Sequence, residues 1–248
     1  VCDENNIDYF IVFGTTLGAI RHGGFIPWDD DIDVGMTRDN YEKFLKIAPT
    51  KLKKDYFMQH FSTEPNMPLY FAKVRKNNTQ FVEYYTRKAK IHQGIFIDIF
   101  PFDQVPNSEK LRRKQFRRAW MWRKMFFAKS VTDTHAKGLK GLLGKIRRSI
   151  RHFLLIPVPK RLLFNLVDEE VRKYNDEQQC SALAFILEPS AVAVPKEVLF
   201  PLRTVKFEHL TVKAPNNCDA YLKKCYGDYW QLPPEEKRGG HNAYYVQV

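Results

Sequence analysis

Hydrophobic residues along the chain follow two periods, one typical of β-strands and one typical of α-helices. Short runs of β-branched and aromatic residues bounded by turn residues predict strands, and apolar residues at every third or fourth position predict helices. The expected strands are 8–13, 32–36, 69–75, 79–84 (returning after a turn at 77–78), 94–100, 183–187, 192–195, and the hairpin 204–207 and 209–213. The expected helices are 16–22, 38–48, 108–129, 139–155, 160–175 and 217–225.

An acidic cluster is the most informative part of this pattern. The stretch from Gly14 to Gly35 reads GTTLGAIRHGGFIPWDDDIDVG. Side chains alternate between the faces of a strand, so Asp31 and Asp33 are expected to point the same way, with Ile32 behind them. Two such carboxylates repel unless a cation lies between them, and hard oxygen ligands suit Mg²⁺ or Mn²⁺. The pattern favours a divalent-metal site; a solvated acidic turn is the alternative.

A segment of small residues precedes the acidic cluster and suits a phosphate group. Gly14, Thr15 and Thr16 would let the backbone approach a phosphate closely, with hydroxyl and N–H groups as donors. Arg21 could add a bidentate phosphate contact. We therefore expect these four residues to bind the phosphates of a nucleotide.

Two later strands carry charged residues within apolar runs. Asp98 lies in the middle of GIFIDIF, where an unpaired carboxylate is costly. We expect Asp98 to complete the metal site or to act as general base on an acceptor hydroxyl, and a loop-capping Asp is the alternative. Lys73 and Arg75 share one face of the strand LYFAKVR, where they contact phosphates or face solvent. Asp103 is expected to cap a turn.

Positive charge is concentrated in one segment of the chain. The formal net charge is +12, and residues 110–161 contain 17 Lys and Arg against one acidic residue, Asp133. The expected helix 139–155 has an apolar face opposite a basic face, a pattern typical of helices that lie on anionic membranes. An ordinary surface helix is the alternative. No run of 18 apolar residues predicts a membrane span, and because the chain opens at Val1 we expect a native segment to precede it.

Two motifs together resemble the LicD family, whose members resemble nucleotidyltransferase-fold enzymes. That superfamily has a Gly-Gly or Gly-Ser pair, a spacer and then Asp-apolar-Asp. Gly14-Thr15 occupies the place of the pair and Asp31-Ile32-Asp33 that of the second element. This chain departs from the motif in having Thr instead of Gly or Ser, and its spacer is rather long. The run PWDDDID at 27–33 is more specific to LicD proteins, and the Lys-x-Arg strand and the tail YGDYWQLPPEEKRGGH also match the family, so the resemblance covers nearly the whole chain.

The resemblance implies an α/β (α+β) fold, a nucleotidyltransferase-like mixed β-sheet flanked by helices, with a basic helical insertion. On this basis we expect a catalytic core at 1–107 and a basic, membrane- or acceptor-facing helical insertion at 108–161. We expect residues 162–248 to complete the core and the substrate pocket.

The activity implied by the resemblance is metal-dependent transfer of phosphocholine from CDP-choline, or a related CDP-alcohol, to a sugar hydroxyl. The acceptor would be a cell-surface glycan precursor, lipid-linked, such as teichoic acid or lipopolysaccharide, handled on the cytoplasmic side of the membrane by a peripheral protein. Asp31, Asp33 and Asp98 would bind Mg²⁺ or Mn²⁺, and the Lys-x-Arg strand of the family implies that Lys73 and Arg75 contact the donor phosphates. The residues expected at the choline or acceptor pocket are Asp29, His92, Tyr226, Tyr229, Trp230 and His241.

Two other functions remain open from the sequence. The same fold could transfer a nucleotide from an NTP and release pyrophosphate. Alternatively, the basic segment 110–161 could serve a non-enzymatic nucleic-acid-binding protein, although this leaves the acidic motif unexplained and no nucleic-acid module is recognised. We therefore expect no nucleic-acid partner. The four scattered cysteines lack zinc-binding spacing and are expected to be reduced thiols.

Overall fold

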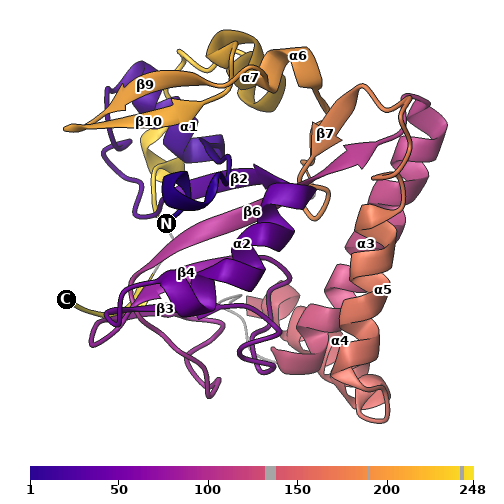
Figure 1. Ribbon diagram of the computed structural model, residues 1–248. Coiled ribbons are helices and arrows are strands. Elements are labelled where there is room, and N and C mark those ends of the chain that lie inside the picture. Colours follow the sequence, from indigo (N-terminus) through magenta and orange to yellow (C-terminus); the bar gives the residue numbers. More distant parts are fainter. Residues whose placement is uncertain (132–137, 189, 241–242) are drawn as a thin grey trace.

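The computed structural model describes residues 1–131, 138–188, 190–240 and 243–248, and the side chains of 138–141 are not described (Figure 1). The helices are α1 (Phe13–Arg21), α2 (Arg38–Lys51), α3 (Glu109–Ser130), α4 (Gly138–Leu155), α5 (Lys160–Arg172), α6 (Lys196–Leu199) and α7 (Cys218–Tyr226), with 3₁₀ turns at Asp3–Asn5 and Glu235–Lys237. The strands are β1 (Phe10–Ile11), β2 (Asp33–Thr37), β3 (Tyr56–Gln59), β4 (Ala72–Lys76), β5 (Gln80–Glu83), β6 (Phe96–Val105), β7 (Ala182–Ala184), β8 (Val194–Pro195), β9 (Arg203–Phe207), β10 (Leu210–Ala214) and β11 (Ala243–Gln247).

A curled mixed sheet of seven strands forms the centre of the fold, as the expected fold class required. Its strand order is β1-β2-β6-β4-β3, and β7 and β8 extend it from the far half of β6. The pair β2 and β6 is parallel, whereas the other pairs in this sheet are antiparallel. The long strand β6 therefore lies between β2 and β4 and connects the two halves of the sheet (Figure 1).

The two faces of the sheet have different roles, which follow from the alternation of side chains along β2. Met36 and its partly buried neighbour Val34 pack with Tyr41 and Phe44 of α2, which crosses this face. Asp33 and Gly35 face the other way. A Cβ atom at Gly35 would lie 2.7 Å from Val12, so glycine is needed for the close approach of β1 and β2.

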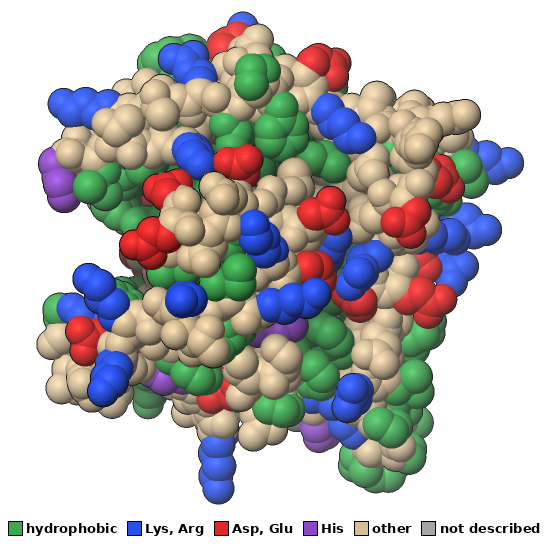
Figure 2. Space-filling view, in the orientation of Figure 1, with side chains coloured by type: hydrophobic (Ala, Val, Ile, Leu, Met, Phe, Trp, Pro, Cys, Tyr) green, Lys and Arg blue, Asp and Glu red, His purple; other side chains and the backbone are tan. Residues whose placement is uncertain are grey.

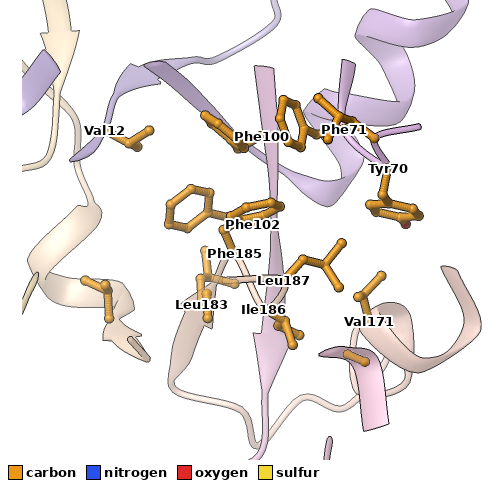
Figure 3. Close-up of a cluster of buried hydrophobic side chains, with 14 of the residues drawn as sticks. Val12, Tyr70, Phe71, Phe100, Phe102, Val171, Leu183, Phe185, Ile186 and Leu187 are labelled. Carbon is orange, nitrogen blue, oxygen red and sulfur yellow. The ribbon is translucent and has the colours of Figure 1, made fainter. Parts of the chain in front are cut away.

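The larger hydrophobic core lies on the face of the sheet opposite α2. It joins β1, β6 and β7 to the helices α3, α5 and α7. Figure 3 shows part of it, where Phe71, Phe100, Phe102 and Phe185 approach one another from different strands and loops. Helices α3 and α5 pack along each other at one side of the sheet (Figure 1). Residues on both sides of position 161 thus contribute to one core.

The N-terminal strand is shorter than expected, and α1 begins earlier. The backbone N–H of Thr16 donates to Val12 O, and the Thr16 hydroxyl donates to Ile11 O at 2.8 Å. These bonds start the helix at Phe13, so Gly14 and Thr15 belong to its first turn. The expectation of a strand over 8–13 that delivers Gly14 at its end was wrong in this respect.

Two other strands differ from expectation because of their neighbours in the sheet. Strand β4 has β3 on one side and β6 on the other, so β5 does not return beside it and pairs with the C-terminal β11 instead. Strand β6 continues past residue 100 to Val105, because β7 pairs with its second half, where Asp103 lies opposite Ala184. The C-terminal hairpin and final helix are confirmed as β9, β10 and α7. Asn217 caps α7 and Gly227, at φ 68°, ends it.

Asp103 does not cap a turn. It is buried in β6 and forms a bidentate ion pair with the buried Arg38, with Nε–Oδ1 and Nη2–Oδ2 distances of 2.7 Å. Asn175 Nδ2 also donates to Asp103 Oδ1, at 2.7 Å. This pair connects the start of α2 to β6 and to the end of α5.

Replacing Asp103 should destabilise the fold strongly. In Asp103→Ala the Arg38 guanidinium stays buried without its carboxylate, a change that costs about 3–5 kcal/mol. We expect this loss in the free energy of unfolding measured with urea. Glu109→Ala, which breaks an exposed i, i+4 ion pair with Arg113, is the control and should change it by less than about 1 kcal/mol. Equal effects of the two substitutions would contradict the structural role of the buried pair.

Candidate functional site: three carboxylates beside an aromatic cavity

Three adjacent strands place charged side chains in one row across the sheet. In the parallel pair β2–β6, Asp33 lies opposite Asp98. In the antiparallel pair β4–β6, Lys73 lies opposite the same Asp98. Residues directly opposite on neighbouring strands have their side chains on the same face. The order across the sheet is therefore Asp33, Asp98, Lys73.

Asp31, two residues before Asp33, joins this row. Carboxylate oxygens of Asp31, Asp33 and Asp98 all lie within 4.8 Å of one another. Asp31 and Asp98 are buried, and Asp33 is half-buried. Burial raises the pKa of Asp33 well above its usual value, and the carboxylates of Asp31 and Asp98 raise it further. Ionised carboxylates repel one another at this distance, and a divalent cation between them relieves that repulsion.

A second group of carboxylates shares Asp31. Oxygens of Asp29, Asp30 and Asp31 also lie within 4.8 Å of one another. A Cβ atom at Gly14 would lie 2.6 Å from Asp29 Oδ2, so the missing side chain in α1 lets this carboxylate approach the helix. The two groups could hold divalent cations on either side of Asp31, with oxygen ligands of the kind that Mg²⁺ and Mn²⁺ prefer.

The first turn of α1 positions β2. The backbone N–H of Asp33 donates to Thr15 Oγ1 at 2.8 Å, and the backbone N–H of Phe13 donates to the Tyr221 hydroxyl of α7 at 3.1 Å. The Thr16 hydroxyl donates to Ile11 and is fully buried. Of the expected phosphate-binding residues, Gly14 lines the cavity beside the carboxylates, and the two threonine side chains bond to the protein backbone.

Lys73 belongs to the carboxylate row and is buried. Its Nζ lies 2.9 Å from Asp98 Oδ1 and 3.7 Å from Glu83 Oε2 of β5. Burial raises the pKa of Asp98, and the Lys73 ammonium acts in the opposite direction. Arg75 is also buried, but its guanidinium donates to Gln59 Oε1 and to Gly94 O. Neither residue faces solvent, and Arg75 has a structural set of partners.

A cavity of about 420 Å³ opens beside the carboxylates. Asp29, Asp31, Asp33 and Asp98 lie on one side of it. The remaining wall is largely aromatic and comes from β6, α1, α7 and the segments before β4 and after β7; it includes Phe13, Phe71, Phe100, Phe102, Phe185 and Tyr226.

Two of the expected site residues lie away from this cavity. Arg21 Nη1 donates to Tyr229 O at 2.6 Å, and its Nε donates to His22 Nε2 at 3.0 Å, so it joins α1 to the C-terminal segment. His92 stacks on Phe57 and lines a separate hollow with residues 78–80.

The C-terminal aromatic residues expected at the choline or acceptor pocket lie in different places. Tyr226 lines the cavity, and burial together with nearby acidic groups, including Asp33, raises its pKa. Tyr229 is buried with its hydroxyl donating to Asp219 at 2.9 Å, and Trp230 is exposed outside the cavity lining. His241 lies outside the described residues. The structure therefore does not bring these side chains together.

Two kinds of comparison relate the chain to known proteins. Residues 6–135, which contain the whole carboxylate row, match the model of the LicD/FKTN/FKRP nucleotidyltransferase domain. The lipopolysaccharide cholinephosphotransferase LicD of Haemophilus influenzae is 31% identical over 257 residues, which cover 98% of this chain and 89% of that protein. The chain belongs to the LicD family. The resemblance noted from PWDDDID is thus confirmed. Two uncharacterized Rickettsia proteins match short segments, at 44% identity over 57 residues and 48% over 46 residues.

Some residues of this LicD-family site were not anticipated from the sequence. Phe100 was a predicted strand residue, and its period-2 spacing from Asp98 could have placed it in the cavity. Phe71 has the same spacing from Lys73. Glu83 and Glu188 carried no signal, because β5 and the segment after β7 reach the site only through tertiary contacts.

The repulsion within the carboxylate row gives a prediction for Asp33→Asn. Without divalent cations, removing this charge should leave the unfolding temperature as high as that of the wild type or higher. Mn²⁺ at 100 times its Kd should stabilise the wild type by about 2.7 kcal/mol and the variant much less. Thermal unfolding in EDTA and in Mn²⁺ measures both effects, with the exposed Asp39→Asn as control. An equal Mn²⁺ response in Asp33→Asn would exclude a metal site at this residue.

Proposed function

We propose that this LicD-family chain is a transferase that moves phosphocholine from CDP-choline to a sugar hydroxyl of a cell-surface glycan precursor. The observation that carries the proposal is the row of Asp31, Asp33 and Asp98 at the edge of a ligand-sized cavity. The Haemophilus relative named for the transfer of cholinephosphate to lipopolysaccharide supports it over nearly the full length of the chain. Lipopolysaccharide and teichoic acid are both possible acceptor classes.

In the proposed reaction the acceptor hydroxyl attacks the phosphorus atom of the phosphocholine group. A new acceptor O–P bond forms, the P–O bond to CMP breaks, and CMP leaves. Mg²⁺ or Mn²⁺ bound by Asp31, Asp33 and Asp98 would neutralise the charge of the donor phosphates. The carboxylate of Asp98 accepts the proton of the hydroxyl, and Lys73 holds that carboxylate in place.

CMP release from CDP-choline measures the proposed activity. Asp31→Asn and Asp98→Asn should each lower the rate by about 10²–10⁴, because each removes a charge that acts on the phosphates or on the proton. Asp39→Asn on the outer face of α2 should retain the wild-type rate. Chromatographic measurement of CMP with Mg²⁺ checks this; undiminished release by Asp31→Asn would rule out the site.

Nucleotidyl transfer is a second candidate, because the matched family model is a nucleotidyltransferase domain. It uses an NTP and releases pyrophosphate. Measurement of both products with CTP and with CDP-choline separates the two reactions: pyrophosphate without CMP favours nucleotidyl transfer.

We also propose that helix α4 contacts an anionic membrane, where a lipid-linked acceptor would be found. Six large apolar side chains of α4 are each at least 47% exposed, and they are Leu142, Leu143, Ile146, Ile150, Phe153 and Leu154. In Figure 2 hydrophobic side chains reach the surface at the lower right, where Figure 1 places α4 and α5. Lys145, Arg147 and Arg151 lie on the same helix. None of the helices, as far as the chain is described, has the length and hydropathy to cross a bilayer.

Vesicle flotation tests this contact. The wild type should float with vesicles rich in phosphatidylglycerol, less so at 1 M salt, and only weakly with phosphatidylcholine alone, because both apolar burial and charge contribute. The pair Ile150→Ser and Phe153→Ser should reduce the bound fraction several-fold. Leu210→Ser with Val246→Ser, which removes exposed apolar side chains from β10 and β11, is the matched control. Equal binding by both double variants would exclude α4 as the contact surface.

A further inference from the structure

The charges of the cavity wall limit what the cavity can hold. Five carboxylates line it: four belong to the aspartate groups, and the fifth is Glu188, in the segment after β7. No Lys, Arg, His, Asn or Gln is present in the described part of that lining. Lys73 lies beneath Asp98 and does not reach the cavity surface. The described lining therefore contributes carboxylates from the aspartate groups and from Glu188, and no basic side chain of its own.

Much of the remaining lining is built from aromatic rings. Phe71 of the segment before β4, Phe100 of β6 and Phe185 after β7 form a compact group, with ring-centroid distances of 4.5 Å for 71–100 and 4.7 Å for 100–185. Phe13 joins them, 5.5 Å from Phe100 in an edge-to-face arrangement. Figure 3 shows Phe71, Phe100 and Phe185 turned toward a common centre.

Glu188 adds a carboxylate to the cavity that these rings line. It follows Phe185 by three residues, and both line the cavity. Its carboxylate lies 3.8 Å from Arg123 of α3, and its side chain remains 41% exposed. Burial raises the pKa of Glu188, while Arg123 acts in the opposite direction. The carboxylate is thus partly desolvated, and Arg123 is its ion-pair partner within the described residues, at 3.8 Å.

Aromatic faces together with a carboxylate attract an organic cation rather than a neutral group. Ring faces carry negative charge density, and attraction to a cation increases when water is excluded. A large, weakly hydrated ammonium group suits such a wall, whereas a small metal ion needs oxygen ligands. We propose that Phe71, Phe100, Phe185 and Glu188 form a binding site for a quaternary ammonium group, separate from the carboxylate row. The proposal rests on the proposed function, since it assigns the choline end of the donor to this wall instead of to Tyr226, Tyr229 and Trp230.

Equilibrium binding tests the site without requiring catalysis. The probes are phosphocholine and 3,3-dimethylbutyl phosphate, in which carbon replaces the nitrogen and only the positive charge is lost. Isothermal titration calorimetry of each probe with the full chain, in the presence of Mg²⁺, gives two dissociation constants and their ratio. We expect the wild type to bind phosphocholine about tenfold more tightly, the size expected from a desolvated cation–π and charge contact.

Two variants locate the selectivity on this wall. Glu188→Gln removes the charge from a partly exposed side chain, and Phe185→Leu removes one ring. Each should lower the phosphocholine preference at least threefold and leave the affinity for 3,3-dimethylbutyl phosphate within about twofold. The controls are the exposed Glu197→Gln and the buried Phe126→Leu, which makes the same ring deletion in the core outside the cavity lining. Both should keep the wild-type ratio, even if Phe126→Leu lowers stability.

The outcomes separate this site from the transfer reaction. Equal binding of the two phosphates by the wild type overturns the proposal, as does an unchanged ratio in both Glu188→Gln and Phe185→Leu. If Phe185→Leu does not fold, the ratio for Glu188→Gln decides alone. A selective ratio that depends on Glu188, found together with no CMP release from any CDP-alcohol, supports the ammonium site and refutes the proposed transfer.

Discussion

The structure depends on how like charges are held together on adjacent strands. Asp33 and Asp98 lie opposite each other on the parallel pair β2–β6, and Asp31 adds a third carboxylate within 4.8 Å. Such a group opposes folding unless cations compensate it. Lys73 supplies one compensating charge from the next strand, at 2.9 Å from Asp98. Its position permits the row to be buried while the open side of the aspartates faces the cavity.

The segments around the row fix its geometry from several directions. Helix α1 bonds to the backbone of Asp33 through Thr15, and α7 bonds to the start of α1 through Tyr221. Arg21 joins α1 to the segment that follows α7. These contacts link the first 33 residues to the last quarter of the chain. The hydrogen bonds Phe13–Tyr221 and Thr15–Asp33 connect α7 to the strand that carries Asp33. The position of the carboxylates therefore depends on the C-terminal part of the chain.

The two faces of the sheet have different roles. One face is covered by α2 and serves stability, helped by the Arg38–Asp103 pair. The other face has the carboxylates at one place and phenylalanine rings next to them, and the same rings continue into the main core. Helices α3 and α5 bury their inner sides against that core, while α4 keeps apolar side chains exposed. The cavity wall and the main core thus share phenylalanine rings, whereas the proposed membrane contact uses the exposed side chains of α4.

The sequence by itself determined the local features. Alternation placed Asp31 and Asp33 on one face, the apolar run marked Asp98 as a buried carboxylate, and PWDDDID identified the family. The tertiary structure decided the rest. Lys73 turned inward to Asp98 and Arg75 to Gln59, and β5 paired with β11. Glu188 and Phe185 line the cavity although they lie far from all three aspartates in the sequence. Periodicity reports which face of an element is apolar, but partners far apart in the chain depend on strand order and register, which no local pattern encodes.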